Sequence, residues 1–124
     1  MKIYVYMGTE SSQTLWSLLA VLGKEEQMKT RAIIEYIRDT YTGRAIRPFA
    51  QKVADLSEEQ INQLNISVSV GKVALYYFLD LKKNRMLITN YSVHGDSDIA
   101  SQKELASQIK NSYTHQLHNY EPYR

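Results

Sequence analysis

Residues 64–91 read LNISVSVGKVALYYFLDLKKNRMLITNY, and this stretch predicts three consecutive β-strands joined by tight turns. Its first part alternates strictly between apolar and polar side chains, which is the period of a half-buried strand. The predicted strands are Leu64–Val70, Val73–Asp80 and Arg85–Tyr91. Gly71-Lys72 has the form of a two-residue turn, and Asp80–Asn84 forms a polar hairpin loop. The stretch therefore predicts an antiparallel three-strand meander.

The residues upstream of this meander predict a strand and a pair of helices. Lys2–Met7 alternates between apolar and polar side chains, as a half-buried strand does. A short and very apolar helix should follow over Leu15–Leu22, with Ser11 or Ser12 as its N-cap. A second helix should span Glu25–Tyr41, because its apolar residues have the spacing of one buried face. The short connection between the helices predicts an antiparallel hairpin.

The residues downstream of the meander predict one helix and a tail. Ser101–Glu104 has the form of a capping box, and apolar residues follow at helical spacing as far as Leu117. Residues 118–124 show no period and are expected to form a mobile tail. Residues 44–56 also lack a period and should form a loop with one helical turn at most.

These elements together predict a single α+β domain over residues 1–117. The helix hairpin should pack on a mostly antiparallel sheet of about four strands, a common size for a sheet. The N-terminal strand is expected to pair with a strand of the meander. The C-terminal helix should cover the other face of the sheet or one of its edges.

Composition limits the class of protein further. A chain of 124 residues with 44% hydrophobic residues suits one domain with one core. No apolar run is long enough to predict a membrane span, and the N-terminus lacks the pattern of a signal peptide. The absence of cysteine excludes disulfides and fits the cytoplasm, which is the expected location. The formal net charge of +2 is low for an obligate nucleic-acid binder.

The order of these segments resembles the RelE/ParE superfamily of bacterial toxins, and within it the HigB-like, phage-derived branch. Met1–Gly43 is similar to the strand and helix hairpin with which these toxins begin. Val73–Phe78 looks like their RVLYFF strand. Arg85–Tyr91, a polar loop and then Glu104–Ala106 at the start of a helix look like their C-terminal part.

Several basic positions of that family are changed in this chain. The strand Gln63–Val68 lacks the arginine that the family often carries, and Lys72 stands where an arginine precedes the VLYFF strand. Val93–Asp96 replaces the lysines that follow the last strand. Unless Lys72 replaces the missing arginine, each change removes a positive group that would hold a phosphate, so the resemblance implies a depleted site.

The resemblance implies the toxin of a type II toxin–antitoxin module, a ribosome-dependent mRNA endoribonuclease that an antitoxin inhibits by covering its sheet. In such a reaction the 2′-hydroxyl of the RNA attacks the adjacent phosphate. The protein supplies cations, an acid and a base, and no metal or other cofactor is needed. The expected catalytic residues are Lys72, Arg85 and His94, and the expected RNA-binding residues are Arg44, Arg47, Lys82 and Lys83.

The same residues leave other functions open. His94 could instead be a solvated loop residue, and Arg44 and Arg47 could be ordinary surface charges. The near-neutral charge favours a non-catalytic phage or mobile-element protein of the same fold that binds and inhibits a host protein. A homodimer through the first helix and Trp16 is a third hypothesis. His115 and His118 lie three residues apart like half of a metal site, but no third ligand is evident, so no metal is predicted.

Overall fold

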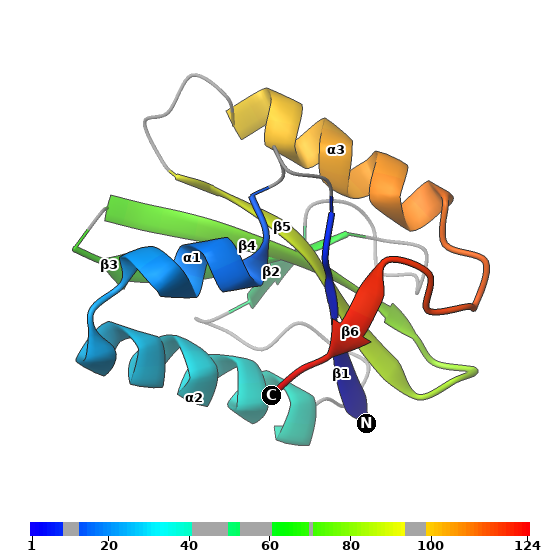
Figure 1. Cartoon of the computed structure of the whole chain (residues 1–124), viewed down its shortest axis with the longest axis horizontal. Coiled ribbons are helices and arrows are strands. Elements are labelled where there is room, and N and C mark those ends of the chain that lie inside the picture. Colours follow the sequence, from blue (N-terminus) through cyan, green and yellow to red (C-terminus); the bar gives the residue numbers. More distant parts are fainter. Residues whose placement is uncertain (9–12, 41–49, 53–60, 70, 94–98) are drawn as a thin grey trace.

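The structure is a computed structural model that describes residues 1–8, 13–40, 50–52, 61–69, 71–93 and 99–124 (Figure 1). The elements are β1 (Lys2–Tyr6), α1 (Leu15–Val21), α2 (Lys24–Thr40), β2 (Ala50–Lys52), β3 (Asn62–Val68), β4 (Gly71–Asp80), β5 (Arg85–Val93), α3 (Ile99–Asn111) and β6 (Tyr120–Pro122). The predicted α+β class is confirmed.

The strands form one mixed sheet in the order β2-β3-β4-β5-β1-β6. The predicted antiparallel meander is present as β3, β4 and β5. The N-terminal strand pairs with the last strand of the meander, as expected, and runs parallel to it from Lys2 opposite Arg85 to Val5 opposite Ile88. The sheet has two strands more than predicted, because β2 extends one edge and β6 extends the other.

The turn between β3 and β4 lies two residues earlier than the sequence predicts. Val68 pairs with Gly71 and Ser67 with Lys72, so residues 69 and 70 connect the strands. Gly71 has a φ of 122°, a backbone conformation that favours glycine. Lys72 therefore belongs to β4, on the face of the strand that also carries Ala74 and Tyr76.

The sheet separates two layers of helix (Figure 1). The hairpin of α1 and α2 covers one face, and α3 covers the other. The larger core lies under the hairpin and contains Leu15, Leu18, Leu19, Leu22, Ile34 and Ile37 from its helices and linker. The smaller core lies under α3 and contains Ile61, Tyr76, Phe78, Leu87 and Ala106. Two cores arise because alternate residues of β4 point to opposite faces.

The first helix begins at Leu15, as the sequence predicts, but its N-cap differs from the one expected. The N-cap of α1 is Thr14, whose hydroxyl accepts a hydrogen bond from the backbone N–H of Ser17 at 3.3 Å. The predicted caps, Ser11 and Ser12, lie outside the described residues. Glu25 and Glu26 occupy the first turn of α2, where the helix dipole favours negative charge. None of the helices in the described ranges has the length and apolarity that crossing a membrane requires.

Two predictions for the C-terminal segment are wrong. Helix α3 ends at Asn111, and the helical spacing read as far as Leu117 does not continue the helix. The predicted tail enters the sheet as β6, which pairs with β1. Aromatic contacts between distant segments hold it there, because Tyr120 packs edge-to-face on Tyr6 and Tyr123 stacks on Trp16. A local period cannot reveal such contacts.

A further prediction is wrong near the middle of the chain, because β2 lies within residues 44–56, where a loop was predicted.

Candidate functional site

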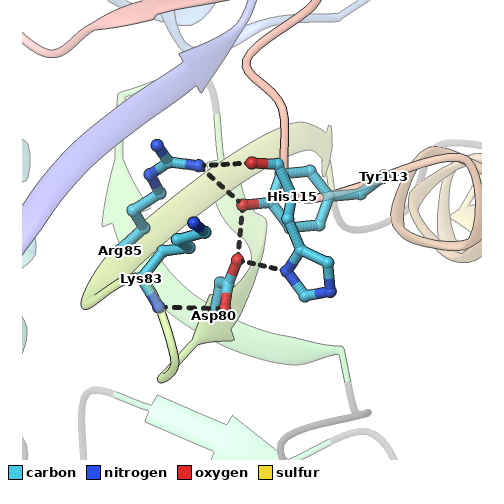
Figure 2. Close-up of polar contacts among 5 residues, drawn as sticks. All are labelled: Asp80, Lys83, Arg85, Tyr113 and His115. Carbon is cyan, nitrogen blue, oxygen red and sulfur yellow. Dashed lines mark hydrogen bonds and ion pairs between the residues drawn. The ribbon is translucent and has the colours of Figure 1, made fainter.

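A cluster of polar side chains lies at the end of the β4–β5 hairpin (Figure 2). Asp80 ends β4 and pairs in the sheet with Arg85, the first residue of β5. Tyr113 and His115 come from the segment after α3, which crosses over this end of the hairpin. Residues from two distant parts of the chain therefore meet at one place.

Asp80 is the centre of this cluster, and its side chain is only 3% exposed. Its Oδ2 accepts hydrogen bonds from the hydroxyl of Tyr113 at 2.6 Å and from Nδ1 of His115 at 2.8 Å. Its Oδ1 accepts the backbone N–H of Lys83 at 3.3 Å. Burial raises the pKa of Asp80, but these hydrogen bonds outweigh burial and hold the pKa below its usual value. The buried carboxylate is therefore ionised and satisfied at neutral pH.

His115 is oriented by this carboxylate. Because an ionised carboxylate can only accept, Nδ1 of His115 must carry the hydrogen between them. The ring is about half exposed, and Figure 2 shows its other nitrogen, Nε2, pointing away from Asp80. Nε2 makes no hydrogen bond within the described part of the chain. This is the arrangement in which a carboxylate orients an imidazole for proton transfer or anion binding.

Arg85 holds the segment that carries His115. One terminal nitrogen, Nη1, donates to the hydroxyl of Tyr113 at 3.1 Å and to the backbone carbonyl of His115 at 2.9 Å. The guanidinium also lies over the ring of Tyr4, 5.5 Å from its centre. Arg85, a predicted catalytic residue, therefore has a structural role in this structure.

A small pocket of about 260 Å³ opens beside the cluster, and we call it the hairpin pocket. It is lined by Phe78, Leu79, Asp80, Lys82, Lys110, Tyr113 and His115. Lys82, a predicted RNA-binding residue, lies here, whereas its neighbour Lys83 is exposed on the turn. Lys110 was not selected from the sequence, and His115 was considered only as a metal ligand beside His118, because the predicted helix ran through both positions and hid the reversal after Asn111.

A larger groove of about 540 Å³ lies on the face of the sheet that α3 covers, and we call it the sheet groove. It is lined by Gln63, Asn65, Ile66, Ser67, Lys72, Val73, Ala74, Tyr76, Ser92 and Lys103. Lys72 comes from β4 and Lys103 from α3. Among the described residues that line it, no side chain is acidic. The groove therefore presents two cations among uncharged side chains, some polar and some apolar.

The structure separates the predicted catalytic residues. Lys72 pairs with Ser67 at one end of β4, whereas Arg85 pairs with Asp80 at the other end. Lys72 and Asp80 are eight steps apart along the extended strand, which corresponds to about 26 Å. Lys72 and Arg85 therefore cannot hold the same phosphate. The other predicted residues, Arg44, Arg47 and His94, lie outside the described residues.

The two histidines near the C-terminus do not share a helix face, because α3 ends before both. His115 bonds Asp80, while Nε2 of His118 lies 2.7 Å from the side-chain oxygen of Gln116. Over the described ranges, no group of three histidine, aspartate or glutamate side chains could hold a metal ion.

Trp16 lies against its own chain. Its ring stacks on Tyr123 with centroids 6.2 Å apart, and the guanidinium groups of Arg31 and Arg124 lie over it. The helix surface suggested for a homodimer is therefore partly covered by the C-terminal segment.

No protein-family model matches this chain, and no curated protein matches its sequence. The proposed functions therefore rest on the chemistry of two surfaces, the hairpin pocket and the sheet groove. The hairpin pocket offers an imidazole oriented by a carboxylate, with two lysines beside it. The sheet groove offers two lysines and several hydrogen-bonding side chains.

Proposed function

We propose that this chain is a HigB/RelE-like toxin that binds mRNA in the sheet groove and cleaves it on the ribosome. The observation that carries the proposal is that Lys72 and Lys103 line one groove whose other described side chains are uncharged. Such a groove attracts a phosphate backbone, because none of its described lining residues is a carboxylate that would cancel the two positive charges. The side-chain amides of Gln63 and Asn65 could hydrogen-bond to the edges of unpaired bases.

The arrangement of elements supports the same proposal. The resemblance to these toxins rests on a strand, a helix hairpin, a meander and a C-terminal helix, and these elements follow one another in this order. The strand β1 lies beside β5, and α3 lies over the opposite face of the sheet from the hairpin. We propose that this architecture is the RelE-like one.

The proposed reaction needs charge neutralisation and two proton transfers. The 2′-oxygen of the RNA attacks the adjacent phosphorus and the bond to the 5′-oxygen breaks, which leaves a cyclic phosphate and a 5′-hydroxyl. Lys72 and Lys103 would stabilise the negative charge that develops on the phosphate oxygens. A base removes the 2′ proton and an acid protonates the leaving 5′-oxygen. His94 is the proposed group for proton transfer, and Arg85 is given no part in the reaction.

The proposed partner is a cognate antitoxin that covers the sheet groove and so excludes RNA from Lys72 and Lys103. The proposed site of action is the ribosome in the cytoplasm. The competing function is a protein of the same fold that binds and inhibits a host protein without cleaving RNA. One observation favours this second candidate, since the described lining of the groove contains two cations but no histidine and no carboxylate.

Expression from a tightly controlled promoter in bacteria would test the proposal. Growth would be followed for the natural chain, for Lys72→Ala/Lys103→Ala and for Lys24→Ala. Lys24 is an exposed residue at the start of α2, on the other side of the sheet, so this variant controls for the loss of a surface charge. In parallel, purified ribosomes with a defined mRNA would be incubated with each protein and the RNA ends mapped.

The toxin proposal predicts growth arrest and mRNA cleavage by the natural chain and by Lys24→Ala, and neither by the double variant. Growth arrest without RNA cleavage would favour the host-protein inhibitor. The absence of both effects for the natural chain would reject the toxin function in that host. Cleavage by the double variant would show that the sheet groove is not the RNA site.

A further inference from the structure

We propose that the hairpin pocket binds a phosphate monoester, the group carried by a free nucleotide or by a phosphorylated RNA end. The groups that would hold this phosphate are Nε2 of His115 and the ammonium groups of Lys82 and Lys110. This proposal does not depend on RNA cleavage. It also concerns the opposite end of β4 from the sheet groove.

The charge balance of the pocket favours an anion. Among the described residues that line it, Asp80 alone is acidic, and three donors already occupy its carboxylate. Lys82 and Lys110 form no ion pair within the described residues. Two uncompensated ammonium groups and an imidazole thus face a pocket whose single negative charge is satisfied by other groups.

His115 is held in one orientation before any ligand arrives. Asp80 binds one ring nitrogen, and Arg85 binds the backbone carbonyl of the same residue. The ring also packs edge-to-face on Tyr113, with centroids 5.4 Å apart. The φ of His115 is 64°, which residues other than glycine rarely adopt. A conformation of this kind that is maintained by several contacts is a recurrent feature of binding sites.

Asp80 also decides which ring nitrogen is left for a ligand. Because Nδ1–H donates to Asp80, Nε2 is the nitrogen that meets the phosphate: it accepts from a P–OH group when the ring is neutral and donates to a phosphate oxygen when a proton is taken up with the ligand. In the described part of the chain, the charged or titratable groups around the ring are Asp80 and Tyr113, which contact it, Arg85, which holds its backbone, and Lys82 and Lys110, which line the pocket. Burial and the neighbouring Asp80 raise the pKa of Tyr113, which therefore remains a neutral hydrogen-bond donor.

The size of the pocket selects the phosphate group and not a whole nucleotide. Its volume of about 260 Å³ is below the range of pockets that enclose a drug-sized molecule. The half-exposed ring of His115 lies at its edge, so a sugar or an RNA chain attached to the phosphate could extend into solvent.

Titration of the natural protein with inorganic phosphate, adenosine 5′-monophosphate and adenosine would test this site. Binding would be measured by calorimetry, and the ring signals of the histidines would be followed by NMR. The proposal predicts binding of the two phosphates and no binding of adenosine. It also predicts that the ring signals of His115 shift while those of His118, an exposed histidine three residues later, do not.

Variants separate this pocket from the sheet groove. His115→Gln, Lys82→Ala and Lys110→Ala should each weaken phosphate binding about tenfold, the usual effect of losing one charge-assisted hydrogen bond. Lys24→Ala and His118→Ala, which alter exposed residues outside both sites, should bind as tightly as the natural protein. Because His115→Gln could disturb the Asp80 cluster, thermal unfolding would be recorded for it, and Lys110→Ala gives an independent result.

RNA distinguishes the two sources of the phosphate. A short RNA with a 5′-phosphate that binds more tightly than the same RNA without it would assign the pocket to RNA ends. Equal binding of the two RNAs, with binding of the mononucleotide retained, would assign it to free nucleotides. The proposal would be overturned if the natural protein bound neither phosphate probe, or if Lys72→Ala weakened binding as much as Lys110→Ala did.

Discussion

Nδ1 of His115 lies 2.8 Å from Oδ2 of Asp80, although 35 positions separate the two residues in the chain. The contact forms because the segment after α3 reverses and crosses the end of the β4–β5 hairpin. Tyr113 donates to the same oxygen, and Arg85 holds the carbonyl of His115. The C-terminal segment is thus tied to the meander by a network around one buried carboxylate.

This network should make the free energy of unfolding depend on pH in the acidic range. Burial raises the pKa of Asp80, but the hydrogen bonds from Tyr113 and His115 lower it more, so the folded pKa lies below the unfolded one. The resulting stability is present above the unfolded pKa of about 3.9 and is lost as the pH falls through the folded pKa. As the pH falls from about 5 to about 2, the range that brackets this titration, the free energy of unfolding of Asp80→Asn should therefore decrease less than that of the natural protein.

At neutral pH, Asp80→Asn should cost about 1–3 kcal/mol, because an amide nitrogen replaces one acceptor oxygen and leaves a buried donor without a partner. Urea unfolding at each pH would measure both effects. Glu104→Gln, which removes an exposed carboxylate from α3, is the control. If the free energy of unfolding changed with pH in the same way for Asp80→Asn and for the natural protein, the pH dependence could not be assigned to Asp80.

The hydroxyl of Tyr76 should stabilise the smaller core through its hydrogen bond with the hydroxyl of Ser92. It lies 2.8 Å from the hydroxyl of Ser92, and Tyr76 is fully buried. Burial raises the pKa of Tyr76, so the pair stays neutral. Tyr76→Phe and Ser92→Ala should each cost about 1–2 kcal/mol, since each leaves a buried hydroxyl unpaired. The double variant should cost less than the sum, which a double-mutant cycle of urea unfolding would show. If the cost of the double variant equalled the sum of the two single costs, coupling between Tyr76 and Ser92 would be excluded.

Tyr123 should anchor β6 to the larger core. It stacks on Trp16, and the backbone N–H of Tyr123 donates to the carbonyl of Ile3 at 3.0 Å. Tyr123→Ala should cost about 2–3 kcal/mol through lost apolar burial and stacking. Trp16 is the only tryptophan, so its fluorescence should shift to the red. Tyr36→Ala, which alters a tyrosine that is 46% exposed, should have a smaller effect on both measurements.

Asn90 should determine how firmly α3 is attached to the sheet. Leu75 pairs with Tyr91 and Tyr77 with Ile88, so β5 has one extra residue at this point. The amide nitrogen of Asn90 donates to the backbone and side-chain oxygens of Gln102, both at 2.9 Å.

Asn90→Ala should cost about 2–3 kcal/mol, because three hydrogen bonds are lost at a buried position, two to Gln102 and one from the hydroxyl of Thr89. Amide exchange should accelerate more in α3 than in α1. The weaker attachment should also reduce RNA binding, because α3 carries Lys103. Uniform acceleration across the chain would mean that Asn90 supports the whole fold and not α3 in particular.

Local periodicity explains which elements could be predicted. The alternation over residues 64–70 and the apolar run over 73–79 correspond to β3 and β4, and the hairpin of α1 and α2 follows from its own spacing. The misplaced turn at Gly71-Lys72 shows the limit of this reasoning. Several residues near a turn can satisfy the same local pattern, and only the pairing of Val68 with Gly71 selects the register.

The candidate sites were predicted less well than the fold. Lys72 and Lys82 do line cavities. Lys72 and Arg85 were predicted to share one site, but Lys72 lies at one end of β4 and Arg85 pairs with Asp80 at the other end. Lys103 and Lys110 were missed, because a lysine on an exposed helix position has no distinguishing pattern until the helix is placed on the sheet.

The sequence alone determined the α+β class, the meander and the helix hairpin, because these depend on which faces of short segments are apolar. Only the tertiary structure decided that residues 120–122 join the sheet, that α3 ends at Asn111 and that His115 meets Asp80. The physical reason is distance along the chain. A hydrogen bond or an aromatic contact between remote residues stabilises the fold without leaving a period in either segment.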